Sequence, residues 1–294
     1  MSAQQSQLFG GSWTEEKLDK LQRYLLAYKT VLKNQPFTLI YIDAFAGTGY
    51  REIVNGGSAD GQLFTELAES EPQRFLDGSV RIALKVDPPF DEYVFIEASE
   101  KRFSELPKIE EDFPQLASRI QLIKGDCNDR LQELCNTRDW NYHRAVLFLD
   151  PFGMQVEWNT IEAVAATKAI DVWILFPLGV AVNRMLTRNG EIPKPWRSRL
   201  DRLFGSDKWF EEFYEEKVTS TLWGDKRRLE KVANFRRIAY YYMEKLEKVF
   251  AGVADNPIQL RNSKGVPLFL LCFAAANPSG ARVAIKIAQH ILGK

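Results

Sequence analysis

Short hydrophobic runs alternate with amphipathic segments through the first 186 residues of this chain. Runs of four to eight apolar residues predict strands, and apolar residues spaced three or four apart predict helices. The predicted strands and extended segments are 37–43, 80–86, 92–97, 120–124, 145–150 and 170–176, and the predicted helices are 14–32, 61–76, 100–116, 128–136, 159–168 and 178–186. This alternation is typical of an α/β fold with a doubly wound, mostly parallel sheet.

The alternation stops after residue 186. Residues 187–250 are polar and aromatic, and a strand at 266–275 and a helix at 279–291 follow. We therefore expect residues 1–186 and 251–294 to form one α/β domain. We expect 187–250 to be a helical insertion that caps the active site or binds a partner.

The insertion carries basic and aromatic side chains in one stretch. Residues 226–250 have apolar positions at helical spacing, which predicts one long amphipathic helix. Its cations, with nearby Trp196 and Trp209, could hold phosphates and stack bases. An ordinary solvated face is an equal alternative, because glutamates such as Glu244 dilute the charge. A run of four glutamates between residues 211 and 216 favours a protein partner.

The first predicted strand leads straight into a glycine-bearing turn. The run Phe37–Ile42 is β-branched and aromatic, as in a strand buried on both faces, and Asp43-Ala44-Phe45-Ala46-Gly47-Thr48-Gly49 follows it. Gly47 and Gly49 allow a tight turn with no Cβ to block a ligand. The segment predicts an adenosine-type cofactor, and a purely structural turn is the alternative.

Two further strands end in acidic residues. Glu97 would lie at the end of the strand 92–97, where a carboxylate can accept hydrogen bonds from ribose hydroxyls. Asp126 could accept from an adenine amine, and Cys127 could offer its backbone N–H. The alternative readings are helix capping around Ser99 and an ordinary aspartate turn at Asp126.

The strand 145–149 ends in Asp150-Pro151-Phe152-Gly153. With the preceding motifs, this run resembles the amine-methylating subset of class I methyltransferases that depend on S-adenosylmethionine (SAM). That subset usually has Asp/Asn-Pro-Pro-aromatic, so Phe152 and Gly153 depart from it. The DPFG form resembles the motif of tRNA guanine-N2 dimethyltransferases, whose target is also an exocyclic amine. The resemblance favours amine methylation of a nucleic acid base.

Nearly the whole chain resembles the three-Cys-motif partner (TcmP) family, a group of bacterial proteins with methyltransferase-like sequences. The resemblance is carried by YIDAFAGTG at 41–49, FDEYVFIEAS at 90–99, LFLDPFG at 147–153 and a late strand-turn-helix at 268–291. It implies a Rossmann-like domain of the class I methyltransferase type and a neighbouring three-Cys-motif protein as partner. The cysteines of the family name belong to that partner.

The resemblance also implies roles for the candidate residues. Asp150 and the carbonyl of Pro151 would hold the amine, Phe152 would form the wall, and Asp150 would also border the cofactor. The other cofactor-binding residues would be Asp43, Ala44, Phe45, Ala46, Gly47, Gly49, Glu97, Asp126 and Cys127. No metal is required for this reaction.

A second run, Asp87-Pro88-Pro89-Phe90, matches the amine-methylating pattern more closely. It precedes the strand that ends in Glu97, whereas the catalytic loop should follow the fourth strand. Because proline fixes φ and restrains its predecessor, we expect a rigid turn between the extended segments 80–86 and 92–97.

Composition fits a soluble intracellular enzyme and narrows its chemistry. The 294 residues are 45% hydrophobic and carry 39 basic and 39 acidic side chains. No apolar stretch is long enough to span a bilayer, and the N-terminus lacks the pattern of a secretory signal, so we expect a cytoplasmic protein. Three cysteines and two histidines at irregular spacing predict neither disulfides nor zinc.

Two other functions are possible from the sequence. The chain could be a non-catalytic or partner-dependent SAM-binding module, although retention of Asp150 favours an enzyme. It could also be an NAD-dependent dehydrogenase, but Glu52 stands where the third glycine of GxGxxG would be.

Overall fold

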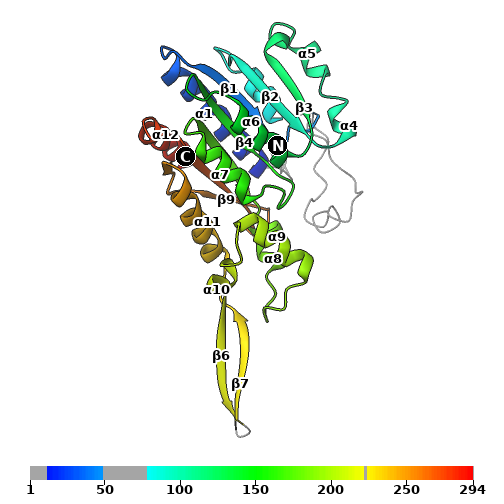
Figure 1. The fold of residues 1–294 in the computed structure, drawn as a ribbon, viewed down its shortest axis with the longest axis vertical. Coiled ribbons are helices and arrows are strands. Elements are labelled where there is room, and N and C mark those ends of the chain that lie inside the picture. Colours follow the sequence, from blue (N-terminus) through cyan, green and yellow to red (C-terminus); the bar gives the residue numbers. More distant parts are fainter. Residues whose placement is uncertain (1–11, 49–77, 222–223, 294) are drawn as a thin grey trace, which may run out of the picture.

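The protein is built around an eight-stranded sheet (Figure 1). The computed structural model describes residues 12–48, 78–221 and 224–293. The strands of the sheet are β1 (Thr38–Asp43), β2 (Glu92–Glu97), β3 (Ile120–Lys124), β4 (His143–Leu149), β5 (Ile170–Phe176), β8 (Gly252–Val253), β9 (Ile258–Arg261) and β10 (Pro267–Ala275). Their order is β3-β2-β1-β4-β5-β10-β8, and β9 also pairs with β10.

The first five strands are parallel, and β10 runs antiparallel to β5. Strands that are covered on both faces need apolar side chains at successive positions. All seven residues of β5 and all nine of β10 are buried accordingly. Alternate residues of one strand enter opposite layers: Ile40 and Ile42 pack into one core, and Leu39 and Tyr41 pack into the other.

Helices cover both faces of the sheet. The core on one face contains residues of α1 (Ser12–Leu32), α3 (Ser79–Leu84), α5 (Lys108–Asp112) and α12 (Ala281–Leu292). The core on the other contains residues of α6 (Cys127–Thr137), α7 (Trp158–Ala166), α9 (Lys194–Phe204), α10 (Trp209–Phe213) and α11 (Phe235–Val249). The fold is therefore the predicted doubly wound, Rossmann-like α/β architecture, with the strand order reversing between β1 and β4.

Most predicted elements of the α/β domain are confirmed, and two are wrong. Residues 79–84 form helix α3 and not an extended segment, because Val80, Ala83 and Leu84 have the spacing of one buried helical face. The predicted helix 100–116 is broken into α4 (Glu100–Phe103) and α5, with Pro107 capping α5. The predicted helix 61–76 lies outside the described residues.

The prediction of one helix over 226–250 is also wrong. Residues 214–221 and 224–231 form the strands β6 (Tyr214–Thr221) and β7 (Gly224–Lys231) of a hairpin that projects from the body of the protein (Figure 1). Helix α11 begins only at Phe235, where the side chain of Asn234 accepts a hydrogen bond from the Arg237 N–H. The charged segment before Asn234 offers no apolar stripe to hold a helix against the core.

Part of the predicted insertion is integral to the core. Tyr242 of α11 stacks on Phe176 at the end of β5, with ring centroids 4.0 Å apart. Residues 178–182 and Asn183–Met185 form the short π-helical turn and the helix α8 that connect β5 to this region. Whether residues 187–250 cap a site or bind a partner stays a prediction.

No helix among the described residues is long and apolar enough to cross a membrane.

Candidate functional site

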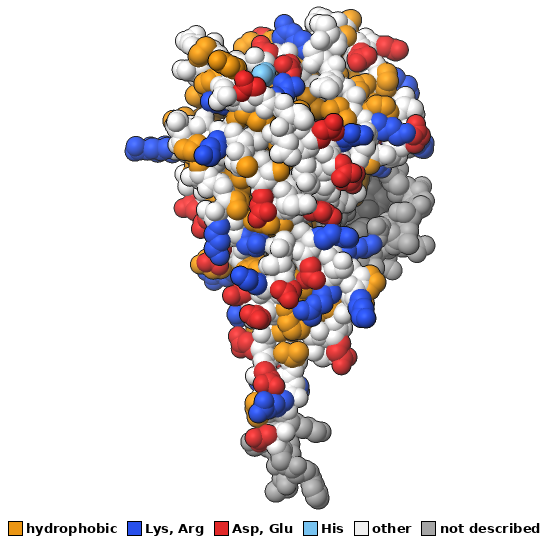
Figure 2. Space-filling view, in the orientation of Figure 1, with side chains coloured by type: hydrophobic (Ala, Val, Ile, Leu, Met, Phe, Trp, Pro, Cys, Tyr) orange, Lys and Arg blue, Asp and Glu red, His pale blue; other side chains and the backbone are white. Residues whose placement is uncertain are grey.

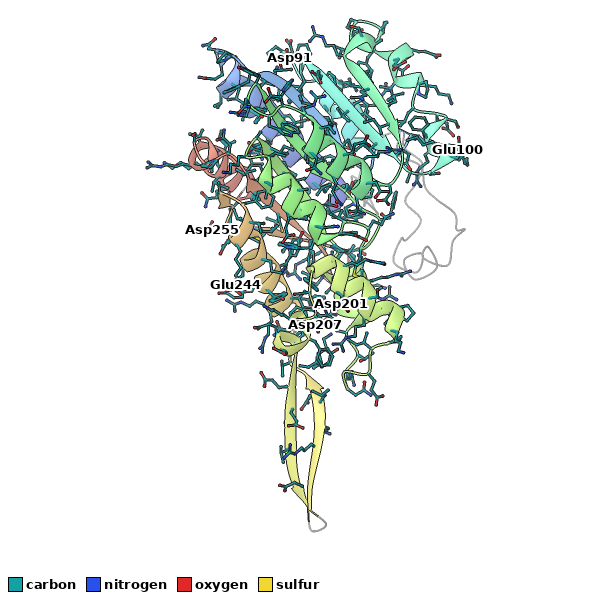
Figure 3. The ribbon with its side chains drawn as sticks, viewed as in Figure 1. Asp91, Glu100, Asp201, Asp207, Glu244 and Asp255 are labelled. Atoms are coloured by element: carbon teal, nitrogen blue, oxygen red, sulfur yellow. The ribbon has the colours of Figure 1, made fainter. Side chains whose placement is uncertain are left out.

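The candidate residues that follow β1, β2, β3 and β4 lie at one edge of the sheet. These four strands are parallel neighbours, so their carboxyl ends point to the same side. In Figure 3, Asp91 marks the start of β2, and Glu100 follows its end. Ligands of doubly wound sheets bind outside the carboxyl ends of the strands.

Glu97 connects the first turn of the site to the loop after β2. Its carboxylate is 4% exposed and accepts hydrogen bonds from the N–H groups of Gly47 (2.9 Å) and Ser99 (2.7 Å) and from Arg102 Nη2 (2.9 Å). A carboxylate offers about four lone-pair sites, so the described residues leave one for a ligand. Both readings of the sequence are compatible, since the Ser99 side chain also caps α4 through the Arg102 N–H.

The turn after β1 is held by its own N–H groups. Ala44 N donates to Phe148 O, Ala46 N donates to Ile96 O, and Phe45 N donates to the Asp43 carboxylate. With Gly47 N bound to Glu97, the four consecutive donors of the turn are used within the protein. None of the N–H groups of residues 44–47 is therefore left to donate to a ligand.

Gly47 has φ +63°, and a Cβ placed on it would have no heavy atom within 4 Å. Its left-handed conformation explains the need for glycine, and the open space beside it leaves room for a ligand. Gly49, the second predicted glycine, lies outside the described residues.

Asp43 supports this turn from beneath. Its carboxylate is fully buried and accepts from Tyr41 Oη (3.3 Å), Ser79 Oγ (2.5 Å) and Phe45 N (3.1 Å). Burial disfavours the charged form and raises the pKa of Asp43 to about 6, and the nearby charge of Asp150 adds to the increase. The predicted cofactor-binding role of Asp43 stays a prediction.

The Asp126 carboxylate is exposed and caps α6. Its Oδ1 accepts from the backbone N–H and the Nδ2 of Asn128. The buried Asn128 also donates to Gln155 O and accepts from Glu157 N, which fixes α6 to the segment after the DPFG run. Burial raises the pKa of the Cys127 thiol to about 12, so only its backbone N–H suits the predicted role.

Asp150 forms an ion pair with a residue of α1. Lys17 Nζ donates to Asp150 Oδ2 at 2.5 Å, and the two side chains are 7% and 25% exposed. Pro151 is buried directly behind Asp150.

Phe152 is 58% exposed, and the Arg102 guanidinium lies 5.2 Å from the centre of its ring. The same guanidinium binds Glu97, and its buried Nε atom has no hydrogen-bond partner in the part of the chain that the structure describes. Arg102 thus brings the predicted wall residue together with the predicted ribose ligand.

The alternative run at 87–90 lies at the opposite edge of the sheet, before the start of β2. Phe90 is fully buried and packs against Tyr28, Tyr41 and Tyr93. Because the Phe90 ring is buried, it cannot stack on a substrate. The run 87–90 is therefore a turn, and it follows helix α3 in place of the expected extended segment.

Sequence reasoning did not find Lys17, Ser79 or the bridging role of Arg102. Lys17 could have been recognised from the sequence, because it lies one turn before Leu21 on the apolar stripe of α1. A lysine is rarely found at such a buried position. Ser79 and Arg102 act through contacts that no local pattern shows.

No group of three or more His, Cys, Asp or Glu among the described residues could hold a metal ion. The three cysteines are buried and unpaired.

No model of a known protein family matches the chain, and no curated protein matches it. The resemblance to the TcmP family therefore stays a prediction.

Several solved structures are similar to the chain at low identity. Protein LPL1258 of Legionella pneumophila, of the family model DUF519, is 13% identical over 82% of this chain and 93% of its own, with a TM-score of 0.41. WbdD is 12% identical over 92% of this chain and 43% of its own, with a TM-score of 0.44. The N-terminal domain of EvdMO1 with SAH bound is 13% identical over 87% and 80%, with a TM-score of 0.39. At these values the comparisons assign neither cofactor nor substrate to this chain.

Proposed function

We propose that this protein is a SAM-dependent methyltransferase that acts on an exocyclic amine of a nucleic acid base. The observation that carries the proposal is the charge and shape of the edge formed by β1 to β4. Among the residues that the structure describes, four carboxylates gather there, those of Asp43, Glu97, Asp126 and Asp150, against two cations, Lys17 and Arg102. Because the carboxylates outnumber the cations, the site favours a positively charged ligand.

The residues fit SAM in three respects. The N–H groups of the turn 44–47 are all bound within the protein and present no competing donor to an ammonium group, and the open space at Gly47 leaves room for the methionine end. Glu97 retains an acceptor site for a ribose hydroxyl. Asp126 is exposed and accepts at Oδ1 only among the described residues, so Oδ2 could accept from the adenine amine.

SAM supplies a methyl group on a sulfonium; the amine nitrogen forms the new N–C bond, the S–C bonding pair stays on sulfur, and the nitrogen then releases a proton. The protein's part is to position the amine and to stabilise the positive charge that develops on nitrogen. Asp150 accepts from an amine proton, with the Pro151 carbonyl as its predicted second acceptor. Phe152 provides an exposed aromatic face next to them.

The nucleic acid part of the proposal rests on the DPFG motif and not on overall charge. Figure 2 shows cations and carboxylates mixed over the visible face, without a basic stripe. The net formal charge is also zero. Non-specific attraction to phosphates is therefore expected to be weak, and recognition would depend on the base itself.

A partner-dependent role is the second candidate. The β6–β7 hairpin projects from the body and exposes Val218 (51%) and Leu229 (40%) on one face. A two-stranded hairpin is marginally stable by itself, so a bound protein would stabilise it. The three-Cys-motif protein implied by the family resemblance is one candidate for the protein that binds this hairpin.

Two variants separate cofactor binding from transfer. Asp150→Ala should abolish methyl transfer from labelled SAM to RNA or DNA and leave SAM affinity within about twofold, a difference of less than about 0.5 kcal/mol. Gly47→Val should abolish SAM binding itself. Equal loss of SAM binding in both variants would refute these roles, and tight binding of NAD in place of SAM would favour a dehydrogenase.

A further inference from the structure

Helix α1 brings a buried lysine to the residue that is proposed to hold the amine. Lys17 Nζ binds Asp150 Oδ2 at 2.5 Å across 133 residues of sequence. The whole Lys17 residue is 5% exposed. Its ammonium also lies 5.1 Å from the centre of the Trp13 ring, which itself stacks on Phe269. The position of Nζ is thus fixed from two sides.

The lysine has more donors than the described residues use. An ammonium carries three N–H groups. Among the described residues, Asp150 is the one hydrogen-bond acceptor of Lys17. The buried Lys20, one turn later, donates instead to the Ile291 carbonyl and lies 3.9 Å from Glu16. Lys17 therefore has N–H groups left for a further acceptor.

Thr14 adds a second incomplete group on the same face of α1. It is 6% exposed, and its buried Oγ1 atom has no hydrogen-bond partner among the described residues. Residues three apart on a helix are neighbours on one face, so Thr14 lies beside Lys17. A buried hydroxyl without a partner costs about 1–3 kcal/mol, which a bound ligand can recover.

Asp150 supplies the complementary acceptor. Its Oδ2 is bound to Lys17, and a carboxylate oxygen can accept more than one hydrogen bond. An acceptor and a donor therefore stand next to each other. A complementary ligand therefore carries a hydrogen-bond donor for Asp150 and, on a neighbouring atom, a hydrogen-bond acceptor for Lys17.

We propose that Lys17, Thr14 and Asp150 form a subsite that holds an aminated heteroaromatic ring by its amino group and by the ring nitrogen next to it. The amino group donates to Asp150, and the ring nitrogen accepts from Lys17 or Thr14. Adenine, cytosine and guanine all contain this N=C–NH₂ unit. The proposal rests on the proposed methyltransferase function and specifies its acceptor.

The same geometry disfavours an aliphatic amine such as a protein lysine side chain. Such an amine is protonated at neutral pH, so its nitrogen has no free lone pair to accept the methyl group. It also offers no acceptor to Lys17 or Thr14. A neutral aromatic amine meets neither difficulty.

The test uses three small probes on the full-length protein saturated with SAH, so that the cofactor's own adenine site is filled. The probes are 2-aminopyridine, which has both groups, aniline, which lacks the ring nitrogen, and pyridine, which lacks the amine. Binding is followed by ligand-detected NMR at pH 8. The wild type should bind 2-aminopyridine at least tenfold more tightly than either other probe.

Variants of α1 identify the subsite. Lys17→Met should remove the preference for 2-aminopyridine over aniline, and Thr14→Val should reduce it about fivefold, the effect of one hydrogen bond. SAH affinity should stay unchanged in both. Lys29→Met is the matched control, because Lys29 is 6% exposed on the same helix and lies 12 residues, about 18 Å, further along it.

The outcomes separate the two proposals. If SAH does not bind the folded wild type, the proposed function fails before any probe is added. If SAH binds but the three probes bind alike, or if the preference survives in both Lys17→Met and Thr14→Val, the subsite is overturned and the cofactor site stands. Thr14→Val removes no hydrogen bond that the described residues make, so it remains informative if Lys17→Met does not fold. Ribonucleosides and 2′-deoxyribonucleosides of the three bases then distinguish RNA from DNA as the source.

Discussion

The Glu97 carboxylate accepts a hydrogen bond from the Gly47 N–H at 2.9 Å, although the two residues lie 50 positions apart. This bond joins the end of β2 to the turn after β1. Because Glu97 also binds Arg102, which packs over Phe152, the shape of three loops depends on one buried carboxylate.

Replacing this carboxylate by an amide should disturb the whole edge. In Glu97→Gln, one carboxylate oxygen is replaced by an NH₂ group. This donor would face an N–H group from which the oxygen accepts a hydrogen bond in the wild type. We expect a loss of about 2 kcal/mol in the free energy of unfolding and at least tenfold weaker SAM binding. Urea unfolding and calorimetric titration measure the two effects. The control Glu100→Gln, at an exposed ion pair with Lys124, should change the free energy of unfolding by less than about 0.5 kcal/mol and the SAM affinity by less than about threefold.

Gly47 allows a test with a closely matched control. Gly47 (φ +63°) and Gly265 (φ +74°) both have left-handed backbones with nothing within 4 Å of an added Cβ. Alanine at either position should therefore cost a similar 1–2 kcal/mol, roughly, from strain alone. Only Gly47→Ala should weaken SAM binding, because Gly265 lies in the turn between β9 and β10, and β4 and β5 separate β10 from β1. Equal affinities in the two variants would contradict a ligand at the Gly47 turn.

The ion pair of Lys17 and Asp150 should appear in a double-mutant cycle. Lys17→Met and Asp150→Leu each leave a partly buried charge without its partner, and each should destabilise the protein by about 2 kcal/mol. The double variant should lose about 1–2 kcal/mol less than the sum. The exposed pair Arg130–Glu133 is the comparison and should show coupling below about 0.5 kcal/mol. Additive losses at Lys17 and Asp150 would mean that the pair is not formed in solution.

A buried carboxyl away from the site should control the pH dependence of stability. Asp171 accepts a hydrogen bond from Tyr24 Oη at 2.6 Å, and burial raises its pKa from 3.8 to about 7. The folded state therefore holds a proton that the unfolded state releases between pH 4 and 7, and stability is lost as pH rises through the folded pKa. This pKa difference corresponds to about 4 kcal/mol at most.

The variant Asp171→Asn removes that ionisation and can still accept from Tyr24. Its stability relative to the wild type should increase from pH 4 to pH 8, by up to about 4 kcal/mol. Urea unfolding of both proteins at several pH values measures the difference. A difference that does not change with pH would show that Asp171 is not the responsible group.

The fold could be predicted from the sequence because its signals are local. Runs such as Ile170–Phe176 are apolar at every position except Asp171, which is typical of a parallel strand buried on both faces. Because the carboxyl ends of parallel strands lie at the same edge of a sheet, the predicted strands were sufficient to place Asp43, Glu97 and Asp150 together. The short helix 79–84 was missed because two helical turns of buried residues also resemble a strand.

The contacts within the site could not be predicted in this way. Lys17 and Asp150 meet because α1 packs across the sheet, and nothing near either residue in the sequence specifies the other. The hairpin at 214–231 was missed because its charged strands have no apolar alternation, so the helical spacing of the following segment was extended through them.

Calorimetric titration of the folded wild-type protein with SAM and with SAH tests the central claim most directly. The account predicts one site per chain with micromolar affinity for both, lost in Gly47→Val and kept in Asp150→Ala. No heat of binding with either compound, in protein whose circular dichroism and unfolding transition are normal, would contradict it.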